Sequence, residues 1–444
     1  METFPTPSTP APGAPRPLRL GSALQLGLSG LALVLILGLA LLLTALMLIT
    51  LIMQGPGSDT LSMALTAAGL GAGVLFLLPA VYYSLVDLLG RPAPSGLAAL
   101  RRLRPWTWPA LFPLLLGLGH LISQAPMAAW LALPPVHVLT VGIPIAWMLF
   151  LGIHGLPLGK DQRFWGVFTS GMLFGPFLIS IVEIAAALGM VVLAAVYIST
   201  QPALVSALTQ LAEQLQGSTP DPEALVEMFG PYLSSPSVML AVIAFGAVLV
   251  PLIEEALKPI GVWLLAGRRL TPAAGFAAGA VSGAGYAFME SLLLTSGGEQ
   301  WASLMLARIG TSAIHILNTA LMGWALVSAW RERRYLRLGL VYLAAVGLHG
   351  LWNGLTLYTA FQSLQQSIEL GPAAAAENSP LAMLTAGGLM ALAFLALFIL
   401  VAVNRRLNRQ FKQRSASNGT IPAAAGEAEI FPGSENQPGP DTRS

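Results

Sequence analysis

The chain has 444 residues, of which 55% are hydrophobic and only 9% are charged. Long apolar runs recur along it, and its mean hydropathy of +0.73 is typical of a polytopic helical membrane protein without a large soluble domain. The lack of cysteine excludes disulfides, thiolate metal sites and a cysteine nucleophile. The net charge of +2 is slightly basic, and its meaning depends on where the basic residues lie.

Hydropathy and helix breakers predict an all-α bundle of about ten transmembrane helices. The predicted spans lie near 24–53, 62–88, 106–123, 134–153, 165–199, 237–266, 272–294, 303–329, 338–360 and 381–403. The chain divides into an N-terminal segment 1–20, N-terminal helices 21–134, a core 135–360, a last loop and helix 361–404, and a tail 405–444. We expect segment 1–20 and the end of the tail to be disordered, because they are rich in Pro, Ser, Gly and Ala.

Lysine and arginine occur only in alternate connections between the predicted spans. The connections after even-numbered spans contain them, and those after odd-numbered spans contain none. The positive-inside rule therefore places both termini in the cytoplasm and the 200–236 connection, which we interpret as a short helical loop, outside. The basic balance reflects orientation in a cell membrane, and we expect no nucleic-acid partner.

Few ionisable residues lie inside the predicted spans. They are Glu183, Glu254, Glu255, Lys258, Glu290, Arg308, His315 and His349. A charged side chain at the centre of a bilayer costs at least about 2.5 kcal/mol, so the residues between 254 and 349 indicate a shared polar interior and are candidate functional residues. Because a helix rises about 1.5 Å per residue, Glu255, His315 and His349 lie at similar depths of roughly 17 to 22 Å.

Helical spacing indicates which side chains face one another. Lys258 follows Glu254 and Glu255 by four and three residues, within ion-pair reach of either carboxylate. His349 and Asn353 lie one turn apart. On the seventh predicted span, a stripe of small residues ends at Glu290 and would allow close helix approach.

Four segments in order resemble the motifs of PrsW-type intramembrane proteases, which are related to the CAAX prenyl endopeptidases and bacteriocin-processing enzymes. The segments are EEALK at 254–258, GYAFMES at 285–291, RIGTSAIHILNTALMGW around His315, and HGLWN at 349–353. The resemblance covers about 250–355, with compatible hydropathy back to about 135, which makes 135–360 the predicted protease core. Ser291 departs from the family, which commonly has asparagine there. The resemblance implies that the chain cleaves membrane-anchored proteins, such as an anti-sigma factor.

Peptide hydrolysis needs an activated water, a proton for the leaving amine and stabilisation of the oxyanion. We expect Glu254 or Glu255 to act as the general base, and the sequence leaves open which one. We expect His315 to be its partner or an oxyanion donor, and His349 with Asn353 to form a second polar clamp. The expected supporting residues are Lys258, Glu290, Arg308 and Asn353.

Two alternative functions remain open. Histidine and glutamate are zinc ligands, so a zinc metalloprotease using His315, His349 and a glutamate is possible, although no HExxH motif is present. We predict a site without cofactor, because Lys258 and Arg308 would oppose a divalent cation and suit an oxyanion. The other alternative is an ion- or proton-coupled transporter, but no internal repeat relates two halves of the chain.

Each candidate residue also has a structural interpretation. The two glutamates could be a pair neutralised by Lys258, and the histidines His315 and His349 could bond neighbouring helices. We expect Glu183 to be structural. For the histidines near predicted span ends we expect interfacial positions; these are His120, His137 and His154.

Overall fold

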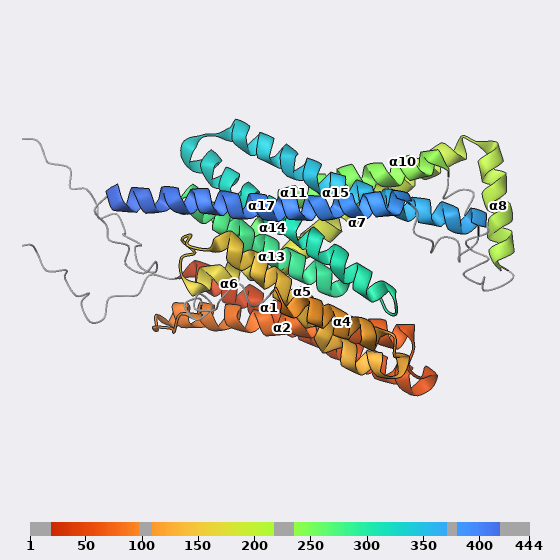
Figure 1. The fold of residues 1–444 in the computed structure, drawn as a ribbon, viewed down its shortest axis with the longest axis horizontal. Coiled ribbons are helices and arrows are strands. Elements are labelled where there is room, and N and C mark those ends of the chain that lie inside the picture. The colour runs from red at the N-terminus through yellow and green to blue at the C-terminus, as the bar shows by residue number, and fades with distance from the viewer. Residues whose placement is uncertain (1–18, 97–108, 217–234, 371–379, 418–444) are drawn as a thin grey trace, which may run out of the picture.

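A computed structural model describes residues 19–96, 109–216, 235–370 and 380–417, and within them the chain is helical throughout, without strands. The elements in order are α1 Leu20–Gln54, α2 Ser58–Leu89, α4 Leu111–Ser123, α5 Pro126–Ile153, α6 Asp161–Thr169, η1 Ser170–Phe174, α7 Gly175–Ser199, α8 Pro202–Gln216, α10 Pro236–Ala244, η2 Phe245–Leu249, α11 Val250–Leu257, α12 Ile260–Trp263, α13 Pro272–Leu293, α14 Gln300–Glu332, α15 Tyr335–Leu370 and α17 Pro380–Ser417. Most helices run along one axis, and α8 crosses that axis at one end of the bundle (Figure 1).

The predicted all-α polytopic bundle is confirmed. Eight helical segments of the described residues are long and apolar enough to cross a membrane, judged by length and composition. They correspond to eight of the ten predicted spans. The other two are α4, an apolar helix of 13 residues, and α13, whose 22 residues are rich in glycine, alanine and serine. The count of about ten is therefore approximate.

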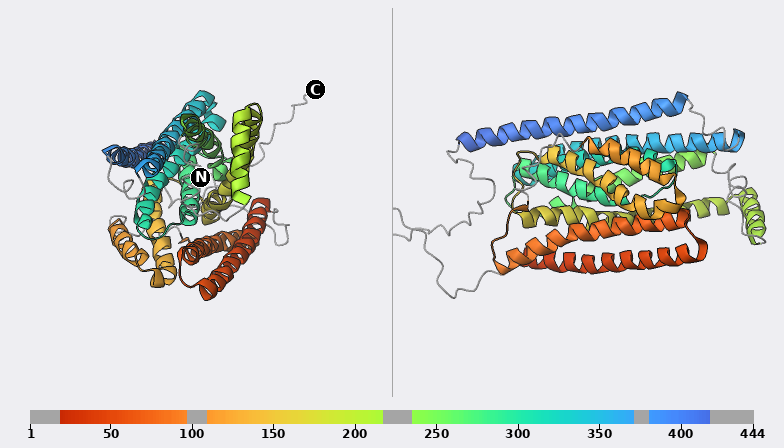
Figure 2. Two further views of the ribbon diagram at one scale, coloured as in Figure 1. Left: turned by 90° about the vertical axis from the view of Figure 1, so that its right-hand side faces the viewer. Right: turned by 60° about the horizontal axis from the view of Figure 1, so that its bottom comes forward.

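Helices α13 and α14 form the interior of the bundle. They are largely buried, whereas α1 and α17 lie at opposite edges and expose apolar side chains (Figure 2). The small residues of α13 allow its backbone to reach that of α14, because a Cβ on Gly283 would lie 2.8 Å from the His315 carbonyl oxygen. Gly279 meets the Thr319 carbonyl more closely still. The predicted stripe of small residues thus sets the spacing between two helices that carry candidate site residues.

Two π-helical turns interrupt the long helical segments. η1 joins α6 to α7, and η2 joins α10 to α11, the helix that carries the two glutamates of the EEALK motif. Each is followed by a proline, Pro176 or Pro251, which has no N–H to donate to the preceding turn. Single π-helical turns inside α-helices are frequent at functional sites. Pro259 then ends α11 directly after Lys258, so the motif occupies a short helix bounded by irregular backbone.

One expectation is wrong. His137 was predicted to lie at a span end, but α5 begins at Pro126, so His137 is in the interior of the bundle and fully buried. Its Nδ1 accepts a hydrogen bond from Trp301 Nε1 at 3.3 Å. The predicted span began at 134, but Pro134 and Pro135 lie inside α5, because membrane helices accommodate proline when neighbouring groups satisfy the freed carbonyls.

Other segments extend beyond their predicted limits. α15 continues to Leu370 and α17 continues through the basic residues to Ser417. In the predicted outer loop, α8 is helical, and residues 217–234 lie outside the described residues. Residues 1–18 and 418–444, where we predict disorder, also lie outside them.

Candidate active site

Lys258 is the centre of a buried polar cluster. Its ammonium nitrogen lies 2.6 Å from Glu254 Oε2 and 2.9 Å from Glu255 Oε1. It also lies 2.8 Å from His315 Nδ1 and 3.4 Å from His349 Nδ1. Lys258 is fully buried, and its charge is therefore balanced by direct contact with the two carboxylates. Spacing alone allowed a pair with either glutamate, and the structure shows both.

The two adjacent glutamates differ in their surroundings. Glu255 is fully buried, and its Oε1 lies 2.9 Å from both Lys258 Nζ and His349 Nδ1. The Glu254 side chain retains 9% exposure, and His349 Nδ1 is 3.8 Å from its Oε2. Glu254 therefore has the more exposed side chain of the two, while Glu255 is held from two sides.

His315 is held at both ring nitrogens. Its Nε2 lies 2.8 Å from Glu290 Oε2, and its Nδ1 faces Lys258. Because an ammonium can only donate, Nδ1 accepts and Nε2 carries the proton donated to Glu290. Arg308 Nη2 approaches the same Glu290 oxygen at 2.7 Å. A chain of charged contacts thus runs from Arg308 through Glu290 and His315 to Lys258.

Ser291 contacts the arginine at the start of this series of charged contacts. Its hydroxyl accepts a hydrogen bond from Arg308 Nε at 3.1 Å, and it lies 3.5 Å from the Ser312 hydroxyl. The residue that departs from the family pattern therefore still contacts the arginine that pairs with Glu290.

Asn353 lies one turn from His349, but it faces the π-helical turn before the glutamates. Its Nδ2 donates to the Gly246 carbonyl at 2.9 Å. Gly350 lies between them, and because it has no side chain, the Ala247 carbonyl of η2 can approach α15 closely. The HGLWN segment thus brings His349 to the cluster and binds the backbone of the turn that precedes α11. The predicted clamp formed by His349 and Asn353 stays a prediction.

Two further residues belong to this interior. Glu183 on α7 is half-buried and interacts electrostatically with Glu254, Lys258 and Glu290. The Tyr286 ring lies 4.8 Å from Lys258 Nζ and packs edge-on against His315 at a centroid distance of 5.2 Å. Glu183 could be recognised as a candidate from the sequence because it is a charged residue inside an apolar span. It was interpreted as structural because no motif surrounds it.

The cluster contains a donor set that fits a metal ion. One ligand atom from each of Glu254, Glu255, His315 and His349 can be chosen so that all four lie within 4.8 Å of one another. Glu290 on the far nitrogen of His315 is the arrangement by which proteins orient a zinc-bound imidazole. The Lys258 ammonium, however, lies among the same atoms, so a metal ion would need this side chain to turn away.

A comparison with protein-family models finds that residues 164–375 match the PrsW family intramembrane metalloprotease. This confirms the resemblance seen in the four motifs and extends it toward both ends. Neither the curated proteins nor the solved structures include a match to the chain. The family description and the buried donor set together favour the zinc alternative over the expected absence of a cofactor.

Proposed function

Because residues 164–375 belong to the PrsW family, the chain is a multi-pass membrane peptidase, and we propose that it hydrolyses peptide bonds of membrane-anchored proteins at the Lys258 cluster. The observation that carries this proposal is the contact of Glu254, Glu255, His315 and His349 around one buried lysine. Three separate helices supply these residues, and each comes from one of the family-like motifs.

The position of the cluster supports a membrane-anchored substrate. Glu254 lies nine residues before Trp263, the end of its membrane-spanning segment, so the cluster is inside that segment and away from its end. The neighbouring α7 exposes large apolar side chains, such as Ile184 and Leu188. A peptide that reaches this depth past such a surface would itself be apolar or adjoin a transmembrane segment. Anti-sigma-factor-like proteins have this character.

We assign the general base to Glu254. Glu255 is fully buried and engaged by both Lys258 and His349, whereas the Glu254 side chain contacts Lys258 and retains 9% exposure. Glu254 would take a proton from water as the water oxygen bonds to the carbonyl carbon. The same proton would pass to the amide nitrogen as the C–N bond breaks, giving a carboxylic acid and an amine. This step needs no other reactant.

The remaining residues would hold the reacting groups in place. Glu290 and Lys258 fix the ring of His315 from both sides, and Glu255 fixes Nδ1 of His349. Nε2 of His349 is then the ring atom that can face a substrate oxygen, and because Nδ1 donates to Glu255, Nε2 would donate to an oxyanion only when the ring is protonated. We propose that His349 stabilises the oxyanion and that His315 helps to orient the general base.

Glu255, His315 and His349 would hold a zinc ion, with Glu254 beside it. Three protein ligands with a fourth position open to water are the pattern of catalytic zinc sites. Such an ion supplies a Lewis acid that polarises a carbonyl and activates water. Lys258 must leave its position for the ion to bind, because its ammonium contacts Glu255 and His315 at 2.9 and 2.8 Å.

The proposal is tested by comparing membrane-protein fragments in cells that express the wild type, Glu254→Gln or the control Glu213→Gln. Glu213 is an exposed glutamate on α8, far along the chain from the cluster. We expect a set of fragments with the wild type and the control, and their loss with Glu254→Gln at equal protein level. Unchanged fragments with Glu254→Gln would remove this residue as the base. No difference between the wild type and cells lacking the chain would favour the transporter alternative.

A further inference from the structure

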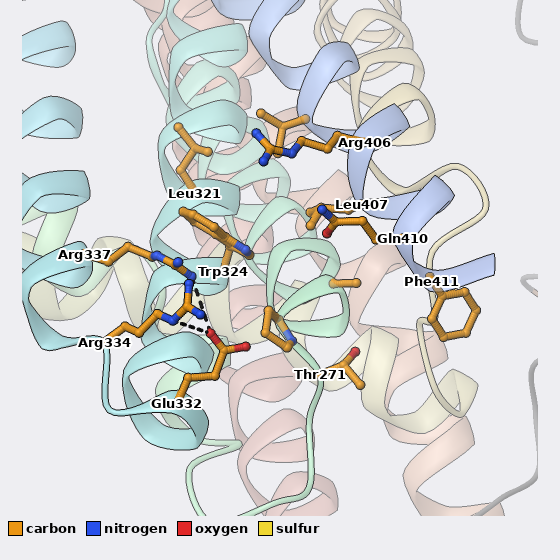
Figure 3. A pocket seen from close by; sticks show the side chains of 13 residues that line it. Thr271, Leu321, Trp324, Glu332, Arg334, Arg337, Arg406, Leu407, Gln410 and Phe411 are labelled. Carbon is orange, nitrogen blue, oxygen red and sulfur yellow. Dashed lines mark ion pairs between the residues drawn. The ribbon is translucent and has the colours of Figure 1, made fainter. Parts of the chain in front are cut away.

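A second polar site lies away from the Lys258 cluster, at the end of the bundle that carries the arginines. It is a hollow of about 390 Å³ where the start of α13, the end of α14, the start of α15 and the last part of α17 meet (Figure 3). The predicted orientation places this end in the cytoplasm. None of the candidate catalytic residues lines the hollow.

The lining of the hollow is positively charged. The lining contains three arginines, Arg334, Arg337 and Arg406, and one carboxylate, Glu332, which leaves two positive charges in excess. Glu332 pairs with Arg334 at 2.9 Å and with Arg337 at 3.6 Å, as the dashed lines in Figure 3 show. Arg406 reaches the hollow from α17 and has no ion pair or hydrogen bond with the described residues. Its guanidinium can therefore offer its donors to a ligand.

The hollow lies at the level where lipid headgroups are found. On α14 the apolar sequence ends at Trp330, directly before the charged residues, and on α17 it ends at Val403, three residues before Arg406. Trp324 lines the hollow, with Arg337 4.6 Å from its ring centroid. Tryptophan and arginine together are characteristic of the membrane interface.

The walls of the hollow distinguish a lipid from a soluble ion. Beside the arginines, part of the wall is apolar and is formed by Leu321, Val403 and Leu407. A free phosphate ion would use only the guanidinium groups. A phospholipid would use both parts, its phosphate at the arginines and the start of an acyl chain along the apolar wall.

We propose that this hollow binds the phosphate headgroup of an anionic phospholipid. The excess positive charge selects an anion, and basic pockets between membrane helices on the cytoplasmic side bind such headgroups. Because α14 also carries Arg308 and His315, the lipid would contact a helix of the proposed protease site. The binding itself does not depend on proteolysis.

The test is native mass spectrometry of the full-length protein in detergent, titrated with phosphatidylglycerol or phosphatidylcholine. We expect one phosphatidylglycerol to bind in preference to phosphatidylcholine. Arg406→Gln should weaken that binding about fivefold, because each basic residue near a membrane surface contributes about 1 kcal/mol. The control is Arg405→Gln, an exposed neighbour on the same helix that does not line the hollow, and it should bind as the wild type does.

Two results would overturn the proposal. Equal phosphatidylglycerol binding by the wild type, Arg406→Gln and Arg405→Gln would show that the hollow is not the binding site. Binding of inorganic phosphate alone, lost in Arg406→Gln and unaffected by added phosphatidylglycerol, would show a soluble-anion site. Because Arg406 is exposed and has no partner among the described residues, its replacement leaves the fold intact, and the comparison stays interpretable.

Discussion

Replacing Lys258 with methionine tests whether the centre of the candidate active site is occupied by the lysine ammonium or by a zinc ion. Methionine keeps most of the volume of the side chain and removes its charge. The ammonium now contacts Glu254, Glu255 and His315 within 2.6 to 2.9 Å. Its loss leaves two carboxylates in a buried cluster without a cation beside them.

The magnitude follows from these contacts. Removing one partner of a buried ion pair costs about 3 to 5 kcal/mol, because the remaining charge is left uncompensated. We expect metal-stripped Lys258→Met to lose stability by about that amount. Zinc no longer has to displace an ammonium in this variant, so the same free energy should appear as a zinc affinity about 150 to 5,000 times that of the wild type.

The assay measures zinc directly. Purified proteins in detergent are stripped with a chelator and titrated with zinc against a competing indicator dye, and thermal unfolding is followed with and without zinc. Zinc should raise the unfolding temperature of Lys258→Met more than that of the wild type. Lys160→Met is the matched control, because the Lys160 side chain is 53% exposed and lies 3.7 Å from Asp87, outside the cluster.

The reasoning fails if Lys258→Met binds zinc no more tightly than Lys160→Met. It also fails if zinc leaves the unfolding of Lys258→Met unchanged. Either result would favour the prediction made from the sequence, in which Lys258 supports a glutamate-activated water and no metal is needed.

Three further predictions concern the fold around the site. Gly283→Ala should lower the unfolding free energy by about 1 to 3 kcal/mol, because its Cβ would lie 2.8 Å from the His315 carbonyl; thermal unfolding in detergent measures it. Asn353→Ala should lower the unfolding free energy by about 1 to 3 kcal/mol, because the Gly246 carbonyl loses its donor. Unchanged thermal unfolding of this variant would contradict the prediction. A protease-cleavable tag at Gly217 should be cut from outside intact cells, with tags at both termini protected; the reverse pattern would refute the predicted orientation.

The site could be predicted from sequence where periodicity and depth determine contacts. Glu254, Glu255 and Lys258 are neighbours on one helix, so their spacing alone fixes their approach. Charges in apolar spans must find partners, which is why residues from other helices were expected to meet them. The structure places His315 and His349 beside this group.

The remaining details depend on backbone that periodicity does not describe. Asn353 bonds the carbonyl of Gly246 in a π-helical turn, and no spacing rule predicts where such a turn falls. His137 was misplaced because the predicted span began at 134, whereas α5 begins at Pro126. Helix α13 is weakly apolar because protein, and not lipid, surrounds it.

Among the charged groups in direct contact, the balance of charge predicts that the site holds one cation at a time. Glu254, Glu255 and Glu290 contribute three negative charges, and Lys258 and Arg308 oppose them with two positive charges in direct contact. With neutral histidines, one negative charge remains. A zinc ion in place of the ammonium would bring the group to neutrality, whereas zinc added beside the ammonium would leave a buried excess of one positive charge, which is costly. Exchange of the two cations is therefore favoured over their coexistence, and the position of Lys258 determines which one the carboxylates bind.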